Sequence, residues 1–211
     1  MKKITLSVLL SCFAVALSLG QNEFTVNLQG QTVTLPENIN TFSWDTMPEN
    51  SKLNGGHYGW VQFYETPVQQ VQDLFKANNL QLIDYIPNKT YLFRFPEGTP
   101  VAFLEENGVR SIVPVEWQYK VTSGLRNGDI PYYAKDGENI LVTLLHHGGV
   151  SSEYIVNDLA AKQITINQNY LGAQTLALSI PNNCLQNLAE QPYVRFIELI
   201  DAPPVKDDKR G

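Results

Sequence analysis

The sequence predicts an α+β protein in which one antiparallel unit occurs twice. Strand-like runs and helix-like spacings follow one another in the same order over residues 57–120 and residues 139–203. The segment "LFRFPEGTPVAFLEENGVRSIVPVEW" at 92–117 has a counterpart with the same pattern of apolar runs and proline, "LALSIPNNCLQNLAEQPYVRFIELID", at 176–201. A hydrophobic content of 43% and a charged content of 17% are those of a folded globular chain.

The N-terminus predicts a secretory signal peptide over residues 1–20. Lys2 and Lys3 precede the apolar run "ITLSVLLSCFAVALSLG", which ends in small residues before the polar "QNE". Cleavage near Gly20 removes two lysines and no acidic residue, so the net charge changes from −6 to −8. We therefore expect a secreted, periplasmic or cell-surface protein, with no stable membrane insertion after the signal is removed.

Residues 21–56 predict a β-hairpin and a linker. The stretch "FTVNLQGQTVTL" at 24–35 alternates apolar and polar residues on either side of "QGQ", which is typical of a hairpin. Pro36, Pro48 and the "NGG" at 54–56 interrupt regular structure before the next element.

The first repeated unit spans residues 57–120. "YGWVQFYE" predicts a strand, and the "TP" at 66–67 predicts a helix start with threonine as N-cap and proline in the first turn. "NNLQLIDYI" and "YLFRF" predict two strands around the turn "PNKT". The "TP" at 99–100 repeats the cap signal before "VAFLEENG", a helix that Gly108 ends. "VRSIVPVEWQYKV" predicts the last strand.

A linker over residues 121–138 leads to the second unit, residues 139–203. "NILVTLLHH" predicts a strand, and Ser151 or Ser152 caps the helix that follows. "ITINQNYL" and "QTLALSI" predict a strand pair, "NCLQNLAEQ" a short helix and "VRFIELI" the last strand. Residues 204–211 are predicted to form an extended, charged tail, because prolines stop the last strand before it.

A unit of this order closes as a split βαβ, or ferredoxin-like, sandwich, with both helices on one face of a four-stranded antiparallel sheet. We therefore expect two tandem ferredoxin-like units after the hairpin. An offset of 85 positions aligns Pro96 with Pro181 and Arg110 with Arg195. The matching order of elements carries more weight than these identities and indicates a duplication. Both arginines are expected to form structural ion pairs or to be solvated.

Composition and motifs exclude several classes of function. The net charge of −6 argues against nucleic-acid binding, which needs a basic face. Cys184 is the one cysteine left after signal removal, so it forms no internal disulfide and is expected to be a small apolar residue near a helix start. The sequence has no zinc-protease, nucleophile-elbow or P-loop motif. It therefore predicts no catalytic residue, no metal site and no cofactor.

The polar clusters that remain do not form a reactive centre. His146 and His147 are adjacent on one strand and point to opposite faces, so they cannot easily hold one metal, and we expect them to be solvated. The pairs at 105–106 and 207–208 predict exposed acidic charge. "NKT" at 88–90 fits the acceptor pattern for Asn-glycosylation.

A partner-binding surface is predicted on the first unit. Val61 and Phe63 point to one face of their strand, and the opposite face has the composition of a protein interface unless the second unit or the hairpin covers it. The residues predicted to bind a partner there are Trp60, Gln62, Tyr64, Leu92 and Arg94. In the tail they are Val205, Lys206, Asp207, Asp208, Lys209 and Arg210.

These features resemble the N-terminal pro-region of a secreted bacterial subtilisin-like serine protease. "GWVQFYETP", "VRSIVPVEW" and "VRFIELIDAPP" are most similar to pro-regions of Bacteroidetes-type proteases, and the resemblance covers residues 24–211. It implies a folding chaperone and inhibitor whose open sheet packs on the catalytic domain, in cis or in trans. The tail, from about residue 202, would then lie in the substrate cleft.

The departures from that family define what the chain would be. The family's catalytic Asp, His and Ser motifs are absent, and "HHGG" is not its histidine motif. The chain would be a severed pro-region or a free-standing inhibitor, and not an enzyme. Two alternatives stay open: a secreted or periplasmic non-catalytic module that binds a peptide or protein, and a small hydrolase that uses His146 or His147. A neighbouring reading frame with Asp-x-Gly, His-Gly and Gly-Thr-Ser motifs would favour the protease interpretation.

Overall fold

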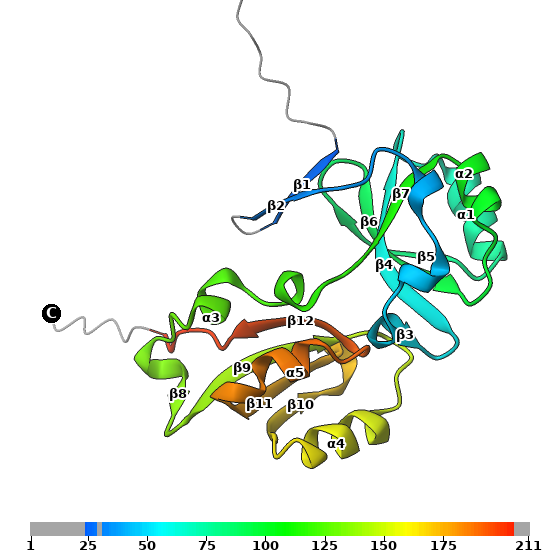
Figure 1. Cartoon of the computed structure of the whole chain (residues 1–211). Helices are drawn as coiled ribbons and strands as arrows, with labels where there is room; N and C mark the ends of the chain where they lie inside the picture. Colours follow the sequence, from blue (N-terminus) through cyan, green and yellow to red (C-terminus); the bar gives the residue numbers. More distant parts are fainter. Residues whose placement is uncertain (1–23, 29–30, 205–211) are drawn as a thin grey trace, which may run out of the picture.

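The computed structural model describes residues 24–28 and 31–204 (Figure 1). The predicted signal peptide and tail residues 205–211 lie outside the described residues. In the described part of the chain, one two-stranded sheet precedes two larger sheets, and all strand pairs in them are antiparallel. The predicted α+β class with antiparallel sheets is confirmed. None of the helices described is long and apolar enough to cross a membrane.

The two-stranded sheet is the N-terminal hairpin that the alternating sequence predicted. Its strands pair with Val26 opposite Val33, so that both side chains lie on the same face. Three short 3-10 turns follow and lead into the first large sheet. These elements are β1 (Thr25–Leu28), β2 (Gln31–Thr34), η1 (Ile39–Thr41), η2 (Trp44–Thr46) and η3 (Glu49–Ser51).

The first large sheet has the strand order β3-β4-β6-β5, and β7 pairs with β4 on the same side as β3. Its helices α1 and α2 both lie on one side of the sheet (Figure 1). Phe75 of α1 and Leu104 of α2 are buried there against Val61, Phe63 and Phe93 of the strands. The elements are β3 (Lys52–Leu53), β4 (Gly56–Phe63), α1 (Gln69–Ala77), β5 (Gln81–Ile86), β6 (Thr90–Pro96), α2 (Val101–Glu106) and β7 (Val109–Pro114).

Both helices of this sheet begin differently from the prediction. Val68 rather than Thr66 is the N-cap residue of α1, and Pro100 rather than Thr99 is that of α2. Neither helix has a side-chain cap hydrogen bond. The hydroxyl of Thr99 donates instead to the carbonyl of Pro96 at 2.7 Å, so it does not serve the helix. The predicted threonine caps are therefore wrong.

The end of α2 follows the prediction, and the end of the last strand does not. Gly108 follows Asn107, the C-cap residue of α2, and has a φ of 85°, a left-handed conformation that glycine adopts without a steric cost. The strand β7 ends at Pro114, whereas the sequence predicted a strand as far as Val121. Residues 117–120 form a 3-10 turn, η4 (Trp117–Lys120), instead.

The second large sheet has the order β10-β11-β9-β12, with β8 pairing to the start of β9. The predicted linker contains a short helix and a 3-10 turn. Ser151 caps α4 by accepting a hydrogen bond from the backbone of Tyr154, as predicted. The elements are α3 (Ser123–Asn127), η5 (Tyr132–Ala134), β8 (Lys135–Asp136), β9 (Asn139–His146), α4 (Ser152–Ala161), β10 (Thr165–Tyr170), η6 (Leu171–Ala173), β11 (Thr175–Pro181), η7 (Asn182–Cys184), α5 (Leu185–Ala189) and β12 (Val194–Leu199).

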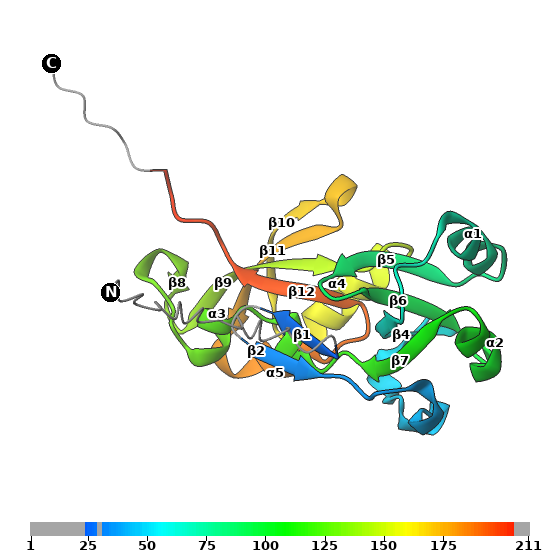
Figure 2. The ribbon, with the colours of Figure 1, turned by 90° about the horizontal axis from the view of Figure 1, so that it is seen from above.

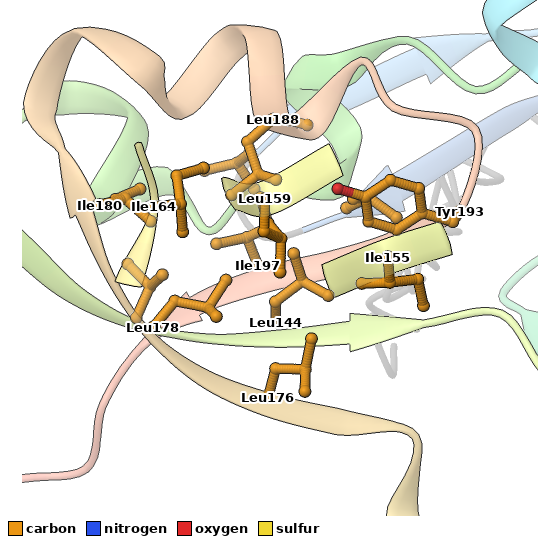
Figure 3. Close-up of a cluster of buried hydrophobic side chains, with 14 of the residues drawn as sticks. Leu144, Ile155, Leu159, Ile164, Leu176, Leu178, Ile180, Leu188, Tyr193 and Ile197 are labelled. Carbon is orange, nitrogen blue, oxygen red and sulfur yellow. The ribbon is translucent and has the colours of Figure 1, made fainter. Parts of the chain in front are cut away.

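The core of the second sheet lies between its strands and the helices α4 and α5 (Figure 3). Alternate strand residues point into this core, because the side chains of a strand alternate between its two faces. Each fully buried Leu or Ile side chain contributes about 1.5–3 kcal/mol relative to an exposed one. The aliphatic residues labelled in the figure are Leu144, Ile155, Leu159, Ile164, Leu176, Leu178, Ile180, Leu188 and Ile197.

One polar network crosses this core. The buried Tyr193 hydroxyl donates to the Asp158 carboxylate at 2.7 Å, and Lys162 forms an ion pair with the same carboxylate. Burial raises the pKa of Tyr193, and the hydrogen bond to Asp158 raises it further, so the hydroxyl stays protonated and remains a donor. The network fastens α4 to the segment just before β12.

Tyr193→Phe is expected to lower the free energy of unfolding by about 1 kcal/mol, the net value of one hydrogen bond. The loss stays small because Asp158 keeps its ion pair with Lys162. Urea unfolding measures it, with Tyr132→Phe as the control because the Tyr132 side chain is 84% exposed. If both variants unfold at the same urea concentration as the natural chain, the Tyr193 hydrogen bond does not stabilise the fold.

Candidate functional site

The two large sheets meet at a junction that has contacts of two kinds. The ring of Tyr58, from β4, stacks on the imidazole of His147 with 3.9 Å between ring centroids and packs into the core of the second sheet. Arg195, at the start of β12, forms an ion pair with Asp84 on β5. The junction therefore fixes two distant parts of the chain against each other.

His147 is buried at this junction, so the expectation that it is solvated is wrong. Its side chain is 4% exposed, and its Nδ1 has no hydrogen-bond partner among the described residues. Burial, together with the neighbouring charges of Lys120, Arg195 and His146, lowers the pKa of His147 to about 3, and burial is the largest cause. The ring is therefore neutral near pH 7. It stacks on Tyr58 as an aromatic surface and not as a base in contact with solvent.

Lys120, on η4, is buried beside His147. Its ammonium donates to the carbonyl of Gln191 at 3.3 Å. Burial lowers the pKa of Lys120 to about 8, and the nearby Glu190 opposes that shift. A cavity of about 20 Å³ at this point has room for about one water, and both Lys120 and His147 line it. This small cavity thus holds titratable groups but no space for a substrate.

A larger hollow lies on the side of the junction nearer the hairpin. Its volume is about 290 Å³, and its walls are mostly apolar apart from the Asp84–Arg195 ion pair. The residues that line it come from the hairpin and both sheets: Leu28, Trp60, Asp84, Ile86, Leu92, Val115, Tyr119, Leu145, Arg195 and Phe196.

The face of the first sheet that was predicted to be open is covered. Trp60 and Leu92 are buried together with Ile86 under Val26 and Leu35 of the hairpin region. The hairpin covers this face because its apolar side needs a surface to bury against, as an isolated two-stranded hairpin is only marginally stable. The sequence left open whether the hairpin or the second unit would cover this face. In the structure the hairpin shields Trp60, and the second sheet shields Tyr58.

Gln62 is also buried, and its side chain has internal partners. Its amide nitrogen donates to the carbonyl of Asn88 at 2.7 Å, and its amide oxygen accepts from the Arg110 guanidinium. Arg110 also donates to the carbonyl of Pro36 at 2.7 Å and lies 4.1 Å from the ring centre of Phe24. Arg110 is therefore a structural residue that holds the hairpin onto the first sheet.

Of the other predicted site residues, Arg94 lies on the same sheet face as Trp60 and Leu92, whereas Tyr64 lies just beyond the end of β4. Tyr64 is 52% exposed at the end of β4, and half-buried Arg94 donates to the carbonyl of Asn54 at 3.0 Å. Asn88, the predicted glycan acceptor, donates through its amide nitrogen to the carbonyl of Thr25 in the hairpin. The tail residues 205–211 lie outside the described residues.

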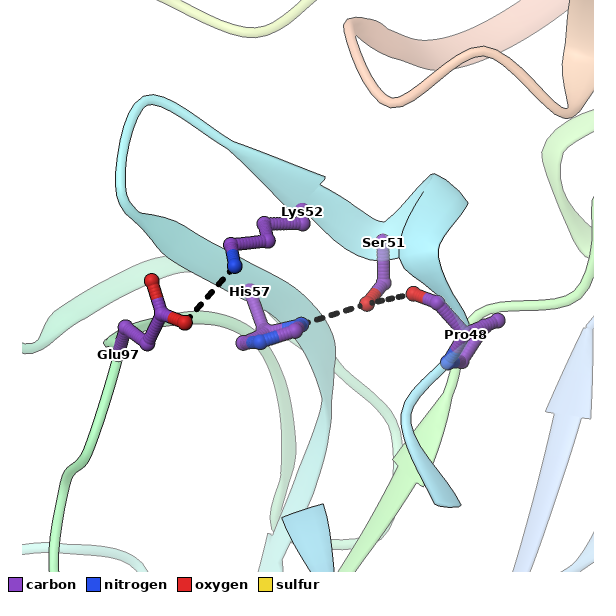
Figure 4. Close-up of polar contacts among 5 residues, drawn as sticks. All are labelled: Pro48, Ser51, Lys52, His57 and Glu97. Carbon is purple, nitrogen blue, oxygen red and sulfur yellow. Dashed lines mark hydrogen bonds and ion pairs between the residues drawn. The ribbon is translucent and has the colours of Figure 1, made fainter. Parts of the chain in front are cut away.

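A serine–histidine pair that the sequence did not point to lies between η3 and β4 (Figure 4). The Ser51 hydroxyl donates to the carbonyl of Pro48 at 2.7 Å, and Nδ1 of His57 lies 2.9 Å from the same hydroxyl oxygen. A hydroxyl has one hydrogen, so Nδ1–H of His57 is the donor in the second contact. His57 therefore does not take a proton from Ser51, and the pair fastens the turn to the strand. The nearby Lys52–Glu97 ion pair is exposed and contributes little.

The helix-free face of the second sheet is a surface that the sequence analysis missed. Thr143 and Leu145 of β9 and Ala177 of β11 point away from α4 and α5, since their neighbours Leu144 and Leu176 point into the core. Phe196 of β12 is opposite Leu145 and lies on the same face. These four side chains, which we call the helix-free face, are half-buried. Period-two alternation in "NILVTLLHH" was the signal that could have identified this face.

The described residues hold no cluster of three or more His, Cys, Asp or Glu side chains that could coordinate a metal. The described part of the chain offers the helix-free face, the apolar hollow, which Leu145 and Phe196 of that face also line, and the sheet edges.

Comparison with known protein families matches the first part of the chain. Residues 27–116 match a family described as a domain of unknown function (DUF8729). The match runs from β1 to just beyond β7, so it takes in the hairpin together with the first large sheet. Searches of curated proteins and of solved structures found no match.

Proposed function

We propose that this chain is the pro-region, or a free-standing inhibitor of that type, of a secreted subtilisin-like serine protease. In this proposal each large sheet with its two helices is a ferredoxin-like unit. Its main support is the strand order, which is β5-β6-β4-β7 in the first unit and β10-β11-β9-β12 in the second. In both units, the strand that comes first in the chain lies between the third and the fourth, and the two helices cover one face of the sheet.

The catalytic domain is proposed to pack on the helix-free face of the second unit rather than on the first. The corresponding face of the first unit is already buried under the hairpin and the second unit, so it has little surface to offer. Half-buried Leu145 and Phe196 provide apolar area, and Thr143 provides a hydroxyl for hydrogen bonding at the rim.

The tail is proposed to enter the substrate cleft of the protease. The strand β12 ends at Leu199, and the exposed residues 201–204 continue without regular structure, leading away from the sheet (Figure 2). An extended segment in a groove forms backbone hydrogen bonds while the sheet buries apolar area. Binding the folded protease more tightly than its unfolded chain would also favour its folding.

Removing the tail is expected to weaken inhibition at least tenfold. A chain of residues 21–203 would be compared with residues 21–211 against the subtilisin-like protease encoded in the same or an adjacent reading frame. The truncated chain keeps the sheet contact but loses the segment in the cleft. The measurement is the inhibition constant, and equal unfolding curves of the two chains serve as the control. Equal inhibition by both would exclude the tail from the mechanism.

A second comparison tests the sheet contact. Ala177→Glu places a charge on the helix-free face and is expected to raise the inhibition constant. Gln186→Glu adds the same charge at an exposed position on α5, on the opposite face, and should leave it unchanged. If the two variants inhibit equally well, the helix-free face is not the contact surface.

A further inference from the structure

The outer edge of β5 is unpaired. This strand pairs with β6 on one side and is the last strand of the first sheet, with no other described strand on its other side (Figure 2). Free edges in soluble proteins are usually protected by lysine, proline, a β-bulge or a covering element, because unpaired N–H and C=O groups accept another strand. The sequence of β5, "QLIDYI", has no lysine or proline, and its pairing with β6 shifts register at one place, between Leu82 and Asp84. Its one charge, Asp84, is already paired with Arg195.

Hollows flank this edge over nearly its whole length. One of about 430 Å³ lies between α1 and the first half of β5. A second, of about 360 Å³, lies on the other face of the sheet, between β5 and the loop after β9, and shares Gln81 and Ile83 with the first. The apolar hollow described above continues along Asp84 and Ile86. The edge of β5 thus lies between two walls, one formed by α1 and the other by the second unit.

The walls are neutral and rich in amides. Gln69, Gln72 and Gln81 line the hollow beside α1, and Gln174 lines the one beside the second unit. Carboxamide side chains can donate to and accept from a peptide backbone whatever its sequence. The positive charges of the walls, on Lys76 and Arg195, balance the negative charges of Asp73 and Asp84.

We propose that the free edge of β5 binds an extended segment of another protein, which adds a strand to the first sheet. The neutral walls fit a segment without charges at its centre, and the net charge of −6 on the whole chain favours basic residues at its ends. A second copy of this chain carries the same net charge, so long-range repulsion disfavours it as the occupant. The strand β5 contains no residue of the helix-free face or the tail, so strand addition at its edge does not depend on the inhibitor role.

The test is a selection of random octapeptides displayed on phage against the secreted chain, residues 21–211. Enriched peptides are expected to lack proline, to have uncharged centres and to slow hydrogen exchange of the β5 amides. The amides of β10, the free edge of the second sheet, should exchange as before and serve as the internal control.

Backbone methylation of an enriched peptide distinguishes strand pairing from side-chain binding. Alternate N–H groups of a strand point to opposite sides, so methylating one alternate set should weaken binding at least tenfold while methylating the other set has little effect. Equal effects of the two sets, protection elsewhere than β5, or no enrichment would overturn the proposal. A dimer with protected β5 amides at micromolar concentration would also overturn it, since a second copy would then be the occupant.

Discussion

Trp60→Ala is expected to lower the free energy of unfolding by about 3–5 kcal/mol, the usual cost of truncating a buried aromatic residue. The Trp60 side chain is 4% exposed and packs with Leu92, Ile86 and the hairpin residues Val26 and Leu35. Removing the indole leaves a cavity at the place where the hairpin meets the first sheet, so the hairpin should also become more sensitive to proteolysis. Urea unfolding followed by circular dichroism and limited proteolysis measure the two effects.

Tyr64→Ala is the matched control, because Tyr64 lies next to the same strand and was predicted to belong to the same surface. Its side chain is 52% exposed, so the substitution should change the free energy of unfolding by no more than about 0.5 kcal/mol. A Trp60→Ala chain as stable as the natural one would mean that the hairpin does not cover this face. Trp60 would then be available to a partner, as the sequence alone predicted.

Acidification is expected to destabilise the chain through His147. An unfolded histidine takes up its proton near pH 6.5, whereas the buried His147 does so only near pH 3. Between these values the unfolded state binds more protons, so the free energy of unfolding falls as the pH decreases from 6.5 towards 3. One such group accounts for roughly 1 kcal/mol per pH unit. This contribution is fully present above pH 6.5.

His147→Phe isolates this contribution, because phenylalanine keeps an aromatic ring against Tyr58 but cannot take up a proton. The free energy of unfolding of both chains would be measured between pH 4 and pH 7. The natural chain should lose stability more steeply, while His57 and the carboxylates affect both chains equally and cancel in the difference. If the free energy of unfolding changes with pH to the same extent in both chains, His147 does not take up a proton on unfolding. The junction then does not keep its ring neutral.

The order and type of the elements were predictable because they depend on local patterns. Period-two alternation identified the hairpin and the strands, and Ser151 was recognised as a cap since its hydroxyl serves a backbone group three residues away.

The surfaces and the junction could not be predicted in the same way. Trp60 and Tyr64 have the same parity in the predicted strand, yet the hairpin buries Trp60, whereas Tyr64 lies beyond the end of β4 and is exposed. Arg195 stood out in the sequence, but nothing there indicated Asp84 as its partner. His147 had a sequence context typical of a solvated residue, and only its position against Tyr58 removes it from water.

The sequence by itself determined the α+β class, the antiparallel strand pairs and the order of the elements. The hydrophobic period and the turn residues act over a few positions, so they can be recognised directly in the sequence. Only the tertiary structure decided which sheet face is covered, which charge meets which, and which strand edge stays free. These depend on how elements far apart in the sequence pack to bury apolar area, and that packing has no local signature.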